Sequence, residues 1–177
     1  MNILKTKKLF TYMVVGALII ALFISCKSKI IPESASDISV PTAAGTEAND
    51  LENKSYSGIL NRKSYQLIEM SENEAQDQIR ESDNFTLGIS ENKITEGFNF
   101  GALNNVQILK SGTEYSANGE TNDTVYNANI KEYIKFIVSA DGNSVEILEY
   151  VGLFRVGEKA CKVTYTGTLT DVLSTIQ

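Results

Sequence analysis

Apolar and polar residues alternate with a period of two over most of the chain beyond residue 50. The alternation is clear in Phe85–Ile89, in Glu132–Ser139, in Val145–Phe154 and in Cys161–Thr170. Asp141-Gly142-Asn143 joins the middle pair and is a strong hairpin signal. Because alternation of this kind places every second side chain on one buried face, these segments are predicted to be β-strands joined by short turns.

Two further patterns lie between residues 55 and 80. Ser55–Leu60 and Lys63–Met70 flank Asn61-Arg62, which predicts a hairpin with a tight turn. Ser71-Glu72-Asn73-Glu74 then matches a capping box, and Ala75–Arg80 continues in helix-favouring residues. We therefore predict one short helix, which covers the surface of the sheet because it lacks a strong apolar stripe.

The fold class follows from the strand count and the turn lengths. About eight strands joined by short turns within residues 51–177 predict an all-β domain, a small antiparallel barrel with the one short helix. Tyr56-Ser57-Gly58-Ile59-Leu60 and Tyr165-Thr166-Gly167-Thr168-Leu169 share the pattern Tyr-(Ser/Thr)-Gly-x-Leu. The first and final strands are therefore expected to pair and close the sheet.

The first 26 residues have the three parts of a secretory signal. Lys5, Lys7 and Lys8 precede an uncharged stretch, Leu9–Ile24, that is shorter than the roughly 20 apolar residues of a bilayer-spanning helix. The small Ser25 then precedes Cys26. An uncleaved anchor, or a plain secretory signal with an incidental cysteine, remains the alternative.

The segment Leu22-Phe23-Ile24-Ser25-Cys26 resembles the lipobox of bacterial lipoprotein precursors, with phenylalanine where the common pattern has leucine. The resemblance implies cleavage before Cys26 and acylation of that cysteine with chains such as palmitate. Lys27 follows, not the aspartate that marks inner-membrane retention in enteric lipoproteins, so the resemblance implies the outer membrane. Several acyl chains would hold the protein stably on the membrane.

Composition then divides the rest of the chain. Residues 27–50 contain both prolines, Pro32 and Pro41, among small and polar residues, as is typical of a linker. The predicted organisation is a signal peptide over 1–25, a lipidated cysteine with a flexible tether over 26–50, and a β-barrel-like domain over 51–177.

The charge of the whole chain is −6, and loss of the three signal-peptide lysines leaves a formal −9. An acidic surface disfavours nucleic acid as a partner.

Residue types limit the chemistry. The chain has no histidine, which excludes Ser-His-Asp triads and His-ligated metal sites. Ser90-Glu91-Asn92-Lys93 matches the S-x-x-K motif of penicillin-recognising enzymes, but the companion Ser82-Asp83-Asn84 precedes it instead of following it. The oxygen-rich segment Asn118–Asp123 could hold a calcium ion, but it lacks the ordered ligand spacing and closing glutamate of an EF-hand, and we expect a solvated hairpin loop there. We assign no catalytic residue, metal or cofactor, and we interpret Cys161 as a buried, unreactive thiol.

Three segments resemble the opening of META-type heat-shock lipoprotein domains: Leu51–Tyr56, Phe85–Ser90 and Lys93–Gly101. The tryptophan expected near Tyr56 is missing, and so is the family's Gly-Cys-Asn turn, in whose place Gly97-Phe98-Asn99 stands. A lipocalin-like barrel competes equally with this resemblance.

The functional hypothesis combines the anchor with the barrel. It is a lipid-anchored, non-enzymatic envelope module that binds a small hydrophobic ligand or an envelope protein, attached to the membrane through Cys26. A ligand cavity inside the barrel would be lined by Phe98, Phe100, Phe136 and Tyr165. The alternatives are a structural or antigenic surface lipoprotein with a filled core and, third, a hydrolase that uses carboxylates.

Overall fold

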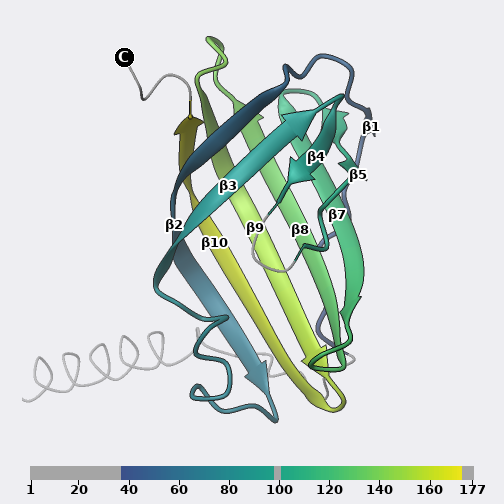
Figure 1. Ribbon diagram of the computed structural model, residues 1–177, viewed down its shortest axis with the longest axis vertical. Helices are drawn as coiled ribbons and strands as arrows, with labels where there is room; N and C mark the ends of the chain where they lie inside the picture. Colours follow the sequence, from purple (N-terminus) through teal and green to yellow (C-terminus); the bar gives the residue numbers. More distant parts are fainter. Residues whose placement is uncertain (1–36, 98–100, 173–177) are drawn as a thin grey trace, which may run out of the picture. The chain divides into compact units, whose positions relative to one another are not determined.

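The computed structural model describes residues 37–97 and 101–172, and these form ten strands of one antiparallel sheet (Figure 1). The signal peptide, Cys26, Phe98 and Phe100 lie outside the described residues. The strands, in chain order, are β1 (Thr46–Glu47), β2 (Lys54–Ile68), β3 (Ser82–Ser90), β4 (Lys93–Glu96), β5 (Val106–Gln107), β6 (Leu109–Ser111), β7 (Glu114–Asp123), β8 (Ala128–Val138), β9 (Ser144–Val156) and β10 (Lys159–Asp171). Their order across the sheet is β1-β6-β7-β8-β9-β10-β2-β3-β4-β5, and the sheet curls into a nearly closed barrel.

The prediction of an all-β, small antiparallel barrel is confirmed, with ten strands where the alternation indicated about eight. Two of the additional strands, β1 and β5, have two residues each and cannot show a period of two. The loop expected at Asn118–Asp123 is wrong, because these residues form the second half of the ten-residue strand β7. The long strands β8, β9 and β10 follow the predicted alternation, and their inward side chains supply much of the core.

The helix predicted over 71–80 is wrong, since this segment forms a series of turns. Its capping box does form: the Ser71 N–H donates to Glu74 Oε2 (2.8 Å) and the Glu74 N–H to Ser71 Oγ (3.3 Å). Beyond it, only Ala75 and Ile79 are buried, and they pack on Cys161 of β10. Two apolar residues are too few to hold a regular helix against the sheet, so the segment covers the barrel wall as consecutive turns.

The hairpin predicted at Asn61-Arg62 is also wrong, because β2 continues through this point. It pairs with β10 along its length, from Tyr56 opposite Asp171 to Ile68 opposite Ala160. The register shifts once, between Thr164 and Tyr165 of β10, where β2 contains one extra residue. The polar interruption in the alternation therefore marks a β-bulge in a long strand.

The predicted pairing of the two strands that share the Tyr-(Ser/Thr)-Gly-x-Leu pattern is confirmed, with Leu60 opposite Gly167. It does not close the barrel, because β2 and β10 are neighbours in the middle of the sheet order. The edges of the sheet are β1 and β5, and closure depends on what joins the β4–β5 side to β7 and β8.

Residues 37–50, expected to belong to the tether, run along the barrel instead. Ile38 is buried against Ile68 and Leu153, and its carbonyl oxygen accepts a hydrogen bond from Arg155 (2.9 Å). Strand β1 pairs with β6, and Ala48 is part of the main core. Composition is typical of a linker here, but buried apolar residues and specific hydrogen bonds order the backbone.

The seam of the barrel is the place where the turn before β5 meets β7. There the backbone of Ala102 closely approaches Gly119 of β7. A Cβ atom on this glycine would lie 1.9 Å from the carbonyl oxygen of Ala102 and 3.2 Å from Cγ2 of Val106. Only a residue without a side chain lets the turn before β5 lie directly on β7.

We expect Gly119→Ala to destabilise the protein by about 3 kcal/mol, because the group in the way is a backbone carbonyl that cannot rotate aside. The control is Gly112→Ala in the β6–β7 turn, where the added Cβ meets open space and only the positive φ of 63° costs about 1 kcal/mol. Denaturant unfolding of both variants measures the difference. Equal losses would contradict a close contact at the seam.

Candidate functional site

The two predicted ligand-binding residues within the described chain, Phe136 and Tyr165, lie in the packed interior. Phe136 is fully buried and stacks on Tyr115 with ring centroids 5.4 Å apart. The Tyr165 ring lies 5.3 Å from Phe85 and 6.2 Å from Tyr150. Both residues belong to one cluster of buried side chains, so at these positions the interior is occupied by the protein itself.

The interior also contains a carboxylate that the sequence reasoning missed. Glu132 of β8 has 0% of its surface exposed. Its Oε2 accepts hydrogen bonds from the backbone N–H groups of Ala102 (2.7 Å) and Leu103 (3.2 Å), and its Oε1 accepts one from the Tyr150 hydroxyl. Glu132 thus links β8 and β9 to the turn that precedes β5.

Electrostatics favour this arrangement. Burial raises the pKa of Tyr150 well above its usual value, and the neighbouring carboxylate raises it further, so the phenol remains a proton donor. Hydrogen bonds from amides and a phenol offset the cost of removing Glu132 from water. The sequence contains a signal for the burial of Glu132, because this residue occupies an inward position of the alternation between Ile130 and Ile134.

Full burial decides what Glu132 can do. A general acid or base must reach substrate, and the Glu132 side chain is fully buried, with its oxygens on the amides of Ala102 and Leu103 and on the Tyr150 hydroxyl. We therefore assign it a structural role in closing the barrel.

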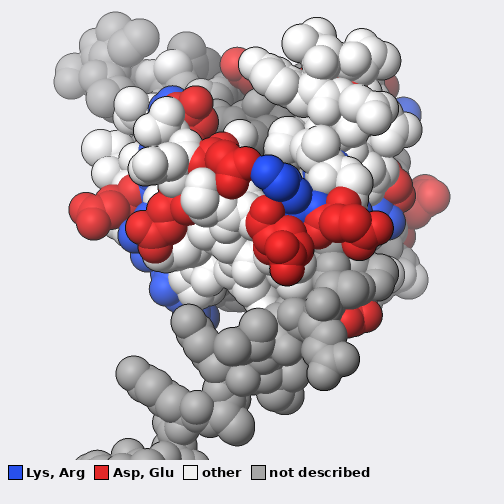
Figure 2. Space-filling view, turned by 90° about the horizontal axis from the view of Figure 1, so that it is seen from below, with Lys and Arg blue, Asp and Glu red and all other residues white. Residues whose placement is uncertain are grey.

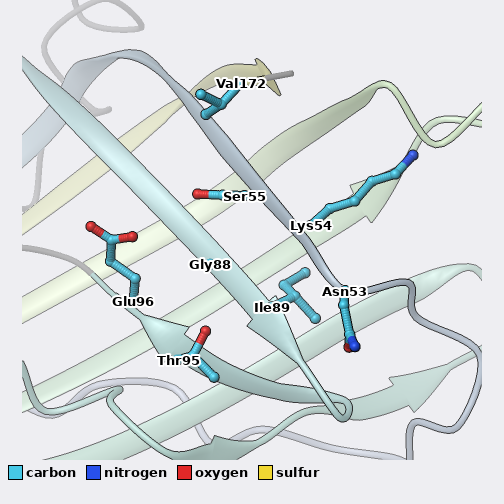
Figure 3. A pocket seen from close by; sticks show the side chains of 8 residues that line it. All are labelled: Asn53, Lys54, Ser55, Gly88, Ile89, Thr95, Glu96 and Val172. Atoms are coloured by element: carbon cyan, nitrogen blue, oxygen red, sulfur yellow. The ribbon is translucent and has the colours of Figure 1, made fainter. Parts of the chain in front are cut away.

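A pocket of about 420 Å³ opens on the outer wall of the barrel, where β2, β3 and β4 meet the end of β10 (Figure 3). Its lining residues are Asn53, Lys54, Ser55, Gly88, Ile89, Thr95, Glu96 and Val172. Figure 3 shows Ser55 of β2 and Glu96 of β4 on opposite sides of β3, which passes between them. A Cβ on Gly88 would lie 2.8 Å from the Cβ of Glu96, so glycine in β3 permits the close approach of β4.

The charge of Lys54 is satisfied at the rim of this pocket. Its ammonium group lies 3.0 Å from Glu52 and 3.8 Å from Asp171, and it donates to the carbonyl oxygen of Gly142 (3.0 Å). The hydrogen bond to Glu52 is the main reason why the pKa of Lys54 is raised. The polar groups that line the pocket besides Lys54 are the hydroxyls of Ser55 and Thr95, the carboxylate of Glu96 and the side-chain amide of Asn53, which suit a polar, hydroxyl-bearing or cationic ligand.

Other chemistry is limited within the described residues. No group of three or more Cys, Asp or Glu side chains is arranged to hold a metal ion there. The Cys161 thiol is buried, and desolvation raises its pKa to about 11, so it stays protonated at neutral pH. Over residues 37–97 and 101–172 we find no helical segment with the length and apolarity that a bilayer crossing requires.

Comparison with protein-family models, with curated proteins and with solved structures gave no match to this chain.

Proposed function

We propose that this chain is a lipid-anchored protein of the bacterial cell envelope, held on the outer membrane through Cys26, and that its barrel is a non-enzymatic binding module that uses its outer wall. The observation that carries the proposal is the contrast between the two surfaces of the barrel. Phe136 and Tyr165 are packed among other core side chains, whereas the pocket beside Ser55 opens outward.

The anchor part of the proposal rests on the signal sequence and on the surface charge. The mature chain would be acidic, and acidic residues do not attract anionic headgroups. Stable attachment would then come from the acyl chains on Cys26.

The ligand part rests on the pocket lining. Hydroxyl and carboxylate groups beside Ile89 and Val172 suit a small molecule with polar groups and an apolar portion, or a side chain of another envelope protein. A second candidate, a structural surface lipoprotein without a ligand, is favoured by the side-chain packing of the described interior.

Labelling with an alkyne analogue of palmitate tests the anchor. We expect the wild-type protein to incorporate the label in cells and Cys26→Ala to lose it, because that thiol is the acylation site. Cys161→Ala is the matched control and should keep the label, since Cys161 is the other cysteine of the chain and is buried in β10. Equal labelling of all three proteins would refute the assignment.

Filling the pocket tests the binding role. Ser55→Tyr places a ring over the cavity, whereas Ser57→Tyr places the same ring two residues along β2, on the same face but outside the lining. We expect native mass spectrometry of the protein isolated from envelopes to show a bound component for wild type and Ser57→Tyr, and its loss for Ser55→Tyr. A component retained by Ser55→Tyr would place binding elsewhere, and its absence from wild type would favour the second candidate.

A further inference from the structure

The turn between β7 and β8 presents two consecutive apolar side chains to solvent. Val125 is 83% exposed and Tyr126 is 67% exposed, more than any other large hydrophobic residue of the described chain. Scattered exposed apolar residues are ordinary. A neighbouring pair at the tip of a projecting hairpin is a more specific feature, and we call Val125 and Tyr126 the apolar tip.

Hydrogen bonds hold the apolar tip in this exposed position. The Asp123 carboxylate accepts from the N–H of Val125 (2.7 Å) and from the N–H of Tyr126 (3.1 Å). Asn127 follows with a positive φ of 49°, a conformation that asparagine tolerates better than most residues. The turn is therefore organised before it meets any partner, which lowers the entropy cost of a contact.

The apolar tip lies at the end of the barrel where the described chain begins. Ile38 accepts a hydrogen bond from Arg155, and Arg155 is opposite Asn129 in the β8–β9 pairing, just beyond the tip. Ile38 also packs against Ile68 at the end of β2 and Ala160 at the start of β10. Figure 1 shows the β7–β8 turn, the β9–β10 turn and the end of β2 at the same end of the barrel.

Chain length then limits the distance between this end and a membrane anchor, an argument that rests on the proposed lipidation of Cys26. Eleven residues lie between Cys26 and Ile38, and the twelve Cα–Cα steps from one to the other span at most about 43 Å at full extension. Strands of a small barrel tilt by about 35–45°, so the 13-residue strand β9 spans roughly 33 Å along the barrel axis. The far end of the barrel could meet the membrane only with most of this segment drawn out along the wall, which favours the end with the apolar tip as the one that faces the bilayer.

We propose that the apolar tip inserts into the interfacial region of the lipid bilayer to which the protein is anchored. Tyrosine is favoured at membrane interfaces because its ring is apolar and its hydroxyl stays hydrated. Figure 2 shows acidic side chains spread across this end of the molecule around a few basic ones. Those acids repel anionic headgroups, so contact is confined to the tip and is strongest on a bilayer with zwitterionic headgroups.

The absence of tryptophan from the chain provides a direct test. Tyr126→Trp introduces one indole at the tip, and Ile59→Trp introduces one at a 57% exposed position on the wall of β2 as the matched control. Each full-length lipidated variant is reconstituted on phosphatidylcholine vesicles, with and without lipids brominated on their acyl chains. We expect the indole of Tyr126→Trp to shift its emission to the blue and to be quenched by bromine, while that of Ile59→Trp stays unshifted and unquenched.

The two proposals fail in different ways. If the protein does not float with vesicles, the lipid anchor is wrong and the membrane contact falls with it. If the protein floats but the indole of Tyr126→Trp remains unshifted and open to aqueous acrylamide, the anchor stands and insertion of the tip is overturned.

Discussion

The closing turn of the barrel depends on one buried carboxylate. The sheet has edges at β1 and β5, and Ile108 alone separates β5, which pairs with β4, from β6, which pairs with β7. Chain connectivity therefore brings the β4–β5 side beside β7, and Glu132 fixes the turn before β5 there by accepting hydrogen bonds from the amides of Ala102 and Leu103 and from the Tyr150 hydroxyl. A carboxylate buried without such donors would cost several kcal/mol. The interaction therefore specifies one position for the closing turn, and Gly119 leaves room for it.

Sequence periodicity predicted the long regular strands of the fold. It did not predict the bulge in β2 or the conformation of segments without a repeating pattern. Alternation identified β8 to β10, and a shared five-residue pattern identified the pairing of β2 with β10. The polar stretch that begins at Asn61-Arg62 contains a bulge at Lys63 of β2, which produces the same polar interruption as a turn. Residues 37–50 have the composition of a linker, yet Ile38 is buried. The conformation of such segments depends on single buried contacts, and these contacts produce no periodic pattern in the sequence.

The candidate site was harder to predict for a related reason. The outer pocket draws its lining from segments that lie far apart in the sequence, from Asn53 to Val172, and only the pairing of β2, β3 and β4 assembles it. Aromatic residues at inward positions suggested a ligand cavity, but Phe136 and Tyr165 pack on other rings. An inward aromatic residue in a small barrel fills the core as readily as it lines a cavity. Phe136 and Tyr165 are packed in the described interior, and the site of recognition that we propose is therefore the pocket on the outer surface.

Amide hydrogen exchange in Glu132→Gln tests the role of the carboxylate most directly. The substitution keeps the shape but replaces charge-assisted hydrogen bonds with neutral ones that are about half as strong. The account predicts that the amides of Ala102 and Leu103 exchange about tenfold faster than in the wild-type protein, equivalent to about 1.4 kcal/mol, while those of β9 and β10 change far less. Glu120→Gln, which alters an exposed carboxylate on β7, should leave both unchanged. Unaltered exchange at Ala102 and Leu103 in Glu132→Gln would contradict the claim that Glu132 fixes the closing turn of the barrel.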